Sequence, residues 1–217
     1  MTDAISLINC DCFGALDLGA TSDLCSLGML FPHEGGFFYR ARCWCPREAS
    51  RWRDLHGIMP SYEPWARAGL ITFTEGDVVD YDFIRRDINA LGKRFRIREI
   101  AYDPFAATQI MTQLMGDGFT MVQFRQGFLS LSAPTKELER LIALGRIWHG
   151  GNPVVRWQAS NVQVETDPAG NIKPTRANRR TQKIDSIITL VMCIGRAAIT
   201  PEGGGKSVYD ERGLLQL

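Results

Sequence analysis

Three aspartates in apolar surroundings are the residues of this sequence whose type and setting most clearly suggest chemistry. Asp17 lies within the apolar run of residues 14–19, Asp103 closes the run of residues 100–102, and Asp185 precedes a long apolar segment. Burying an unpaired carboxylate is costly. Carboxylate oxygens suit Mg²⁺ or Mn²⁺, and two such ions can hold the attacking and leaving oxygens of a phosphodiester. The three aspartates are therefore a candidate site for two divalent metal ions.

Each aspartate also has a structural explanation when it is taken alone. Asp17 could occupy a strand edge or pair with an arginine. Asp103 precedes Pro104, and an Asp-Pro pair is a good helix N-cap with proline at the first helical position. Asp185 stands just inside a helix start, where the helix dipole favours an acid. The chemical interpretation rests on the combination, because a first strand, the end of a later strand and the start of the last helix can converge at one edge of a sheet.

The sequence pattern also predicts the elements that must position these aspartates. Apolar or aromatic runs with short polar connections, at residues 11–19, 24–31 and 37–45, favour an antiparallel meander of three strands. Further on, helical spacing alternates with strand-like runs. Helices are predicted over residues 80–94, 104–116, 134–144, 152–159 and 184–199, and strands over residues 70–74, 97–102 and 119–124. This order predicts an α/β domain whose mixed sheet, the meander plus parallel strands, is flanked by helices.

Length and composition bound the class of protein. The chain has 217 residues, of which 45% are hydrophobic and 23% charged, an ordinary globular composition that can bury one sizeable core. We expect one domain over residues 1–200 and a flexible, glycine-rich tail over residues 201–217. The sequence has no apolar run of about 18 residues, so no membrane span is expected. Residues 1–4 show no basic region followed by an apolar stretch, so we expect no secretion signal.

The distribution of charge is more informative than its sum. The net charge is only +1, but residues 1–119 carry a net charge of −4 and residues 120–217 a net charge of +5. The second half contains a stretch with five basic side chains and no acid: Lys173, Arg176, Arg179, Arg180 and Lys183. Such a stretch is a candidate phosphate-contacting segment, and a solvated basic loop is an equal alternative.

Cysteine and histidine offer weaker chemistry. We interpret the six cysteines as reduced thiols, most of them buried in apolar elements: Cys10, Cys12, Cys25, Cys43, Cys45 and Cys193. A four-cysteine zinc site is less favoured, because zinc sites usually space their cysteines by two to four residues. The histidines His33, His56 and His149 are scattered and form no metal-binding motif.

Three motifs, taken in order, give the chain a family resemblance. The first is Leu-Asp-Leu-Gly-Ala-Thr-Ser-Asp at residues 16–23, the second is Ile-Ala-Tyr-Asp-Pro at residues 100–104, and the third begins Lys-Ile-Asp-Ser-Ile-Ile at residue 183. With them the chain resembles the nuclease domain of the large terminase subunit of tailed bacteriophages, a member of the ribonuclease H-like, or retroviral-integrase-like, group. Further similar segments lie at residues 126–138, 149–153, 157–162 and 207–214.

The resemblance implies a function and a site. It implies a ribonuclease H-like fold and an endonuclease that cuts double-stranded DNA with two Mg²⁺ or Mn²⁺ ions held by Asp17, Asp103 and Asp185. Lys183 would lie near the scissile phosphate, and Asp23 could support the site. DNA would contact Lys173, Arg176, Arg179 and Arg180. The implied partners are double-stranded DNA, the terminase ATPase domain, the small terminase subunit and the portal, in the cytoplasm of a bacterial host.

One departure from the complete large terminase concerns its ATPase motor. The sequence has no G-x-x-x-x-G-K-[ST] loop, because Thr200 stands where the first glycine would precede Gly205-Lys206-Ser207. We therefore expect an isolated nuclease domain that neither translocates DNA nor hydrolyses ATP. Two alternatives remain open: a non-catalytic DNA-binding or docking module of the packaging motor, and a junction resolvase or RNA-strand nuclease of the same fold.

Overall fold

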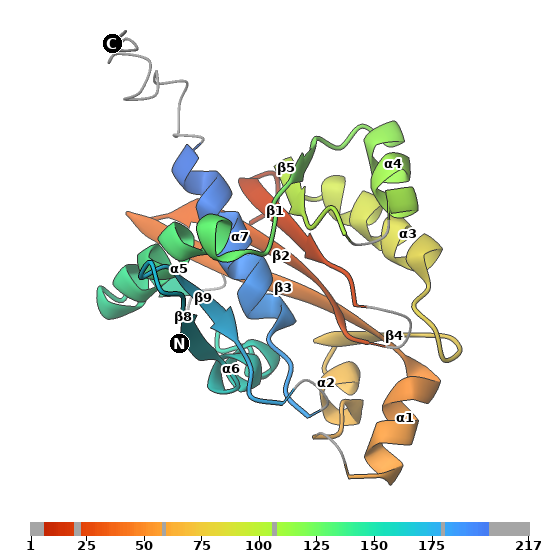
Figure 1. The fold of residues 1–217 in the computed structure, drawn as a ribbon. Coiled ribbons are helices and arrows are strands. Elements are labelled where there is room, and N and C mark those ends of the chain that lie inside the picture. Colours follow the sequence, from red (N-terminus) through yellow and green to blue (C-terminus); the bar gives the residue numbers. More distant parts are fainter. Residues whose placement is uncertain (1–6, 20–22, 58–59, 106–107, 179–180, 200–217) are drawn as a thin grey trace, which may run out of the picture.

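A mixed sheet forms the centre of the computed structural model, which describes residues 7–19, 23–57, 60–105, 108–178 and 181–199. Within these ranges its order is β4-β3-β2-β1-β5-β6, with β7 also pairing with β3 (Figure 1). The sheet strands are β1 (Asp11–Asp17), β2 (Cys25–His33), β3 (Gly36–Pro46), β4 (Ile71–Thr74), β5 (Arg96–Tyr102), β6 (Met121–Gln123) and β7 (Ile147–Trp148). A separate hairpin contains β8 (Gln163–Thr166) and β9 (Ile172–Thr175). The helices are α1 (Arg47–Leu55), α2 (Glu63–Arg67), α3 (Tyr81–Gly92), α4 (Thr108–Gly116), α5 (Phe128–Ala143), α6 (Pro153–Ser160) and α7 (Asp185–Ile199).

The first three strands form the predicted antiparallel meander. β1 pairs with β2, and β2 pairs with β3 along its whole length. Glu34 and Gly35 connect β2 to β3, and both have positive φ angles, of 46° and 72°. Positive φ at both central residues is the geometry of a two-residue turn that matches the twist of its strands. The hairpin therefore fixes the register of β2 against β3.

The later sheet strands β4, β5, β6 and β7 join the sheet in parallel, β4 and β7 against β3, β5 against β1 and β6 against β5. Successive strand residues point to opposite sides of the sheet, so both faces carry apolar side chains, and helices cover both. Leu16 and Met29 pack in the core beneath α3 and α4, whereas Ala15 and Leu30 pack beneath α5, α6 and α7 (Figure 1). The predicted mixed sheet flanked by helices is confirmed.

Helix α7 lies at the centre of the second layer. Its residues from Asp185 to Gly195 are all buried, as expected for a helix that is apolar on nearly every side. It packs closely on the sheet, where the Cys193 thiol donates to the Phe13 carbonyl at 3.3 Å. The predicted helix of residues 184–199 is therefore confirmed, and it carries Asp185 to the sheet.

Two predicted helix starts are wrong. α4 begins at Thr108, so Asp103 and Pro104 do not form its first turn. Helix α5 begins at Phe128, and Pro134 lies inside it. Proline normally interrupts a helix because it has no N–H to donate. Here Pro134 is buried, and tertiary packing maintains the helix across it.

The small strands β7, β8 and β9 are absent from the prediction. β8 is exposed at every position, so it has no apolar alternation to reveal it. Residues 167–171 form a turn in which Asp167 Oδ1 accepts hydrogen bonds from the Ala169 and Asn171 N–H groups. This turn joins β8 to β9 and so places Lys173 and Arg176 on one arm of a hairpin and just after it.

The cysteines are free thiols in the structure. Cys10 is partly exposed and the other five are buried, as the apolar elements around them suggest. Burial raises the pKa of the Cys12 and Cys43 thiols to about 12, so these groups stay protonated. Among the described residues, no helix is long and apolar enough to cross a membrane.

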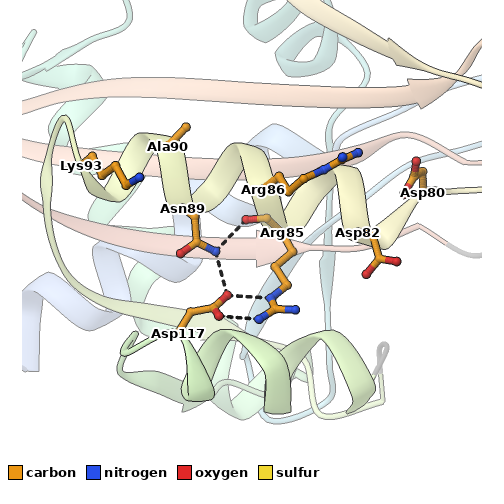
Figure 2. A pocket seen from close by; sticks show the side chains of 8 residues that line it. All are labelled: Asp80, Asp82, Arg85, Arg86, Asn89, Ala90, Lys93 and Asp117. Carbon is orange, nitrogen blue, oxygen red and sulfur yellow. Dashed lines mark hydrogen bonds and ion pairs between the residues drawn. The ribbon is translucent and has the colours of Figure 1, made fainter.

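Figure 2 shows an open polar groove between α3 and the residues that follow α4. Arg85 forms two hydrogen bonds to the Asp117 carboxylate, and Asn89 Nδ2 donates a third at 2.7 Å. These bonds lower the pKa of Asp117 to about 2. These hydrogen bonds thus connect α3 to the end of α4, and both helices lie on the same face of the sheet.

We expect the Asp117→Asn variant to melt at a lower temperature than wild type at neutral pH. A carboxyl whose folded pKa is depressed stabilises the fold above its unfolded pKa of 3.8 and loses that contribution as the pH falls towards 2. The difference in Tm should therefore shrink between about pH 4 and pH 2. Thermal unfolding followed by circular dichroism measures it, with Asp82→Asn, an exposed aspartate of the same groove, as control. An equal difference at every pH would contradict this account.

Candidate active site

Asp17 and Asp185 line one cavity. Asp17 ends β1 and Asp185 begins α7, which packs against β1. The cavity has a volume of about 340 Å³, and Asp23, Gln126, Lys173 and Arg176 also line it. The strand and the helix predicted to carry two of the three aspartates therefore bring them together.

The two carboxyl groups are held in an environment that disfavours their charge. Burial and the neighbouring charge of Asp185 raise the pKa of Asp17 to about 7, against the opposing effect of the hydrogen bond from Gln126. Burial and the charge of Asp23 raise the pKa of Asp185 to about 6. Desolvated carboxylates that repel each other are stabilised by a shared cation. The electrostatics thus favour a positive ion between them.

An unsatisfied oxygen supports the same conclusion. Asp185 Oδ2 is buried and has no hydrogen-bond partner among the described residues. A buried polar atom normally has a partner, and such an atom in a native structure needs an explanation. Together with the oxygen-rich lining, this oxygen fits a hard divalent cation. The residues present at this cavity therefore suit Mg²⁺ or Mn²⁺.

Asp103 lies beside this pair but does not line the cavity. It follows β5, and the parallel pairing of Leu16 with Tyr102 puts Asp103 opposite Asp17 at the neighbouring strand end. Its Oδ1 accepts a hydrogen bond from the Phe105 N–H at 3.0 Å. Over the described ranges, no group of three His, Cys, Asp or Glu side chains is close enough to hold a metal ion. The structure thus brings two aspartates together and leaves the third adjacent.

Lys183 is paired with Asp23 instead of facing the cavity. Its side chain is only 4% exposed and forms an ion pair with Asp23 Oδ1. Arg53 of α1 lies 3.7 Å from the same oxygen. The charge of Lys183 nevertheless acts on the site, since it lowers the pKa of Asp185. Asp23 therefore connects the cavity to two cations.

The predicted phosphate-contacting residues are partly placed at the cavity. Lys173 lies on β9, 3.4 Å from Glu165 and over the ring of Phe128. Arg176 follows β9, and its charge lowers the pKa of both Asp17 and Asp185. Its Nε is buried without a hydrogen-bond partner in the described part of the chain. Arg179 and Arg180 lie outside the described residues.

Gln126 is a site residue that the aspartate pattern does not predict. Its Nε2 donates to Asp17 Oδ1 at 3.3 Å. It follows β6, the parallel neighbour of β5, and parallel strands carry functional residues at their carboxyl ends. Three adjacent strands thus end beside this site: β1 ends with Asp17, β5 ends just before Asp103, and β6 ends three residues before Gln126. The order of the parallel strands could have identified Gln126, but its residue type alone could not.

Comparison with known proteins gives the family. Residues 2–201 match the family described as terminase large subunit, endonuclease domain. The chain is 31% identical over 198 residues to Protein YmfN of Escherichia coli K12, covering 87% of this chain and 43% of that protein. It is 31% identical over 202 residues to the large terminase subunit of Enterobacteria phage HK97, covering 88% of this chain and 39% of that protein. The chain therefore spans less than half the length of these relatives.

Solved structures show the same architecture. The HK97 bacteriophage large terminase superimposes with a TM-score of 0.79 at 29% identity, over 88% of this chain and 40% of that chain. The large terminase nuclease of thermophilic phage G20c, solved with bound magnesium, superimposes with a TM-score of 0.57 at 10% identity, over 86% and 82%. The second match shows the fold alone, and it confirms the ribonuclease H-like prediction. Since the family match spans nearly the whole sequence, the chain belongs to the terminase large subunit endonuclease domains.

Proposed function

We propose that this domain is a metal-dependent endonuclease that cuts double-stranded DNA during viral genome packaging. The observation that carries the proposal is the pair formed by Asp17 and Asp185, two buried carboxyl groups with raised pKa values at one cavity. Perturbed titratable groups that meet in a cleft mark functional sites. The family match and the magnesium bound by the phage G20c nuclease support the same assignment.

One set of residues would hold the metal ions, and another would bind the DNA. Asp17 and Asp185 would hold two Mg²⁺ or Mn²⁺ ions, with Asp103 completing the set from the neighbouring strand end. When bound, such ions lower the pKa of an attacking water and stabilise the leaving oxygen. Gln126 holds one oxygen of Asp17 and so orients the carboxylate. Asp103 would have to turn towards Asp17 to reach an ion.

Basic side chains would bind the DNA backbone. Lys173 and Arg176 border the cavity, where they can hold phosphates without reading the base sequence. Lys183, behind Asp23, would offset the charge of the scissile phosphate at longer range. Binding should therefore weaken as salt rises, and cutting should depend little on sequence. Arg179 and Arg180 belong to the same proposed DNA-binding segment.

The proposed biological setting follows from the relatives. In a large terminase, this domain would act with an ATPase domain, a small terminase subunit and a portal. It would do so in the cytoplasm of an infected or lysogenic bacterium. The match to the HK97 large subunit supports this setting.

The test is incubation of the purified chain with supercoiled plasmid in Mg²⁺, in Mn²⁺ and with chelator. Nicking and linearisation that require a metal are the expected result. Parallel assays on branched DNA and on RNA–DNA hybrid separate this activity from a junction resolvase or an RNA-strand nuclease. A folded sample that neither binds Mn²⁺ in calorimetry nor cuts would contradict the proposal and favour a docking module.

A further inference from the structure

Two amide side chains, Gln158 within α6 and Asn161 at its C-terminal end, hold the backbone on both sides of Asp185. Gln158 Oε1 accepts a hydrogen bond from the Ser186 N–H at 2.7 Å, and Asn161 Nδ2 donates to the Lys183 carbonyl at 2.9 Å. Asp185 therefore sits between two anchored residues. We propose that Gln158 and Asn161 are positioning residues that aim the Asp185 carboxylate at its metal ion, an inference that rests on the function proposed above.

The bond from Gln158 replaces a local helix cap. The first N–H groups of a helix have no partner within the helix, and a nearby Ser, Thr, Asp or Asn side chain usually accepts them. In α7 the acceptor for Ser186 comes instead from another helix, 28 residues earlier in the chain. Ser186 and Gln158 are both fully buried, so water cannot take over the bond. The start of α7 is consequently fixed by α6.

The carbonyl of Ser186 is anchored as well. The Tyr39 hydroxyl of β3 donates to it at 2.5 Å and lies 2.8 Å from Thr189 Oγ1. Both backbone groups of Ser186 are thus held by buried side chains, one from a helix and one from the sheet. This arrangement fixes the first turn of α7 relative to β1, the strand that carries Asp17.

Asp185 needs such support because its own carboxylate has little. Its Oδ2 has no hydrogen-bond partner among the described residues, so no hydrogen bond to that oxygen fixes its direction. Burial of the Gln158 amide costs folding free energy, because its Nε2 has no hydrogen-bond partner among the described residues. An apolar side chain would pack at that position at lower cost. A requirement for the Oε1 acceptor explains why an amide is present.

The test compares Mn²⁺ binding by wild type and by the Gln158→Leu variant, using calorimetry. Leucine keeps the packing and removes the acceptor. Loss of a side chain that orients a metal ligand typically weakens metal affinity about 10–100-fold. We expect the Mn²⁺ dissociation constant to rise by about tenfold or more, and the Mn²⁺ concentration for half-maximal plasmid cleavage to rise with it.

Two further variants separate positioning from general stability. Asn152 caps α6 by accepting from the Val154 and Val155 N–H groups, at the end of the helix opposite to Gln158. Asn152→Ala should therefore lower the Tm and leave Mn²⁺ affinity unchanged. If Gln158→Leu does not fold, Asn161→Ala, a less buried residue, provides the same comparison.

The outcomes identify which hypothesis fails. Unchanged Mn²⁺ affinity in folded Gln158→Leu, with a Tm lowered as in Asn152→Ala, would overturn the positioning role and leave the proposed function standing. Failure of the wild-type chain itself to bind Mn²⁺ would overturn the proposed function, and this inference with it.

Discussion

We expect the Asp17→Asn variant to lose metal-dependent DNA cleavage by at least about a thousandfold. Asparagine has the size of aspartate but no charge, so its neutral oxygen would hold a metal ion shared with Asp185 much more weakly. Asp17 is also the residue on which the charges of Asp185, Asp103 and Arg176 all act. Its replacement therefore removes the centre of the proposed site and leaves the backbone of β1 in place.

The same substitution should make the metal-free domain more stable at pH 8. The folded pKa of Asp17, about 7, lies above its value of 3.8 in an unfolded chain. Between these values the folded state binds more protons than the unfolded state, so stability falls as the pH rises through this interval. The uncharged asparagine side chain would remove that cost. We therefore expect Asp17→Asn to have a higher Tm than wild type at pH 8 and a similar Tm near pH 4.

The measurement is thermal unfolding of both proteins in chelator at pH 4.5 and pH 8, beside the plasmid assay with Mn²⁺. Asp11→Asn is the matched control, because Asp11 begins the same strand and is paired with Arg96 and Arg98. Those arginines lower its pKa, so this substitution should give no stability gain at pH 8. Retained cleavage by Asp17→Asn would remove Asp17 from the catalytic site. A stability gain that is equal at both pH values would contradict the electrostatic explanation.

The parts of the fold that the sequence predicts are those with strong apolar patterns. The meander of β1, β2 and β3 is recognisable because short polar turns separate long apolar strands. Helix α7 is recognisable because it is apolar on nearly every side and is buried from Asp185 to Gly195. In contrast, β8 is exposed throughout, and only the turn beside it has a local signal. Exposed strands are defined by pairing, which a single sequence does not reveal.

The site was predictable in part for a related reason. Asp17 and Asp185 stand out because a carboxylate within an apolar element is costly unless it has a partner. Asp103 stands out equally, but the sequence does not determine which way its side chain turns after β5. Its bond to the Phe105 N–H satisfies it locally, outside the cavity lining. The Asp103 carboxylate can thus either accept the local hydrogen bond from Phe105 or take the metal-binding role that the family resemblance implies.

The family resemblance includes residues 157–162, but the positioning role proposed for Gln158 was beyond prediction. Gln158 lies on a helix face between apolar neighbours, where an amide has no distinguishing spacing. Lys183 was expected beside a phosphate, yet its ion pair with Asp23 depends on the loop before β2 approaching the loop before α7. Such contacts join segments that are distant in sequence. Only the packing of α6 and α7 on the sheet brings them together.

That packing depends on Gly28, and the Gly28→Ala variant should therefore lose stability. A Cβ atom at Gly28 of β2 would lie 2.8 Å from Thr189 Oγ1 and 2.9 Å from Tyr39 Cε2. These distances are shorter than normal contacts. Neither side chain can easily retreat, because their hydroxyl groups are hydrogen-bonded beneath the first turn of α7. Overpacking of this kind costs about 1–3 kcal/mol, or roughly 2–12 °C in Tm for a domain of this size.

Gly116→Ala is the matched control. A Cβ atom at Gly116, the last residue of α4, meets nothing within 4 Å, and alanine favours helix over glycine. This variant should be as stable as wild type or slightly more so. Urea unfolding of the three proteins gives the comparison. If Gly28→Ala were as stable as Gly116→Ala, the close contact between β2 and α7 would not constrain the fold.

The substitution should also affect the site, because Thr189 lies one turn after Asp185 on α7. An added methyl group that pushes Thr189 from the sheet would move the start of α7 away from the end of β1. Asp185 would then separate from Asp17, and the pair would hold a shared cation less tightly. We therefore expect Gly28→Ala to bind Mn²⁺ more weakly than Gly116→Ala in calorimetry at a temperature where both are folded. Unchanged Mn²⁺ affinity in a destabilised Gly28→Ala would show that the hydrogen bonds from Gln158 and Tyr39 to Ser186 hold Asp185 in place even when the rest of α7 shifts.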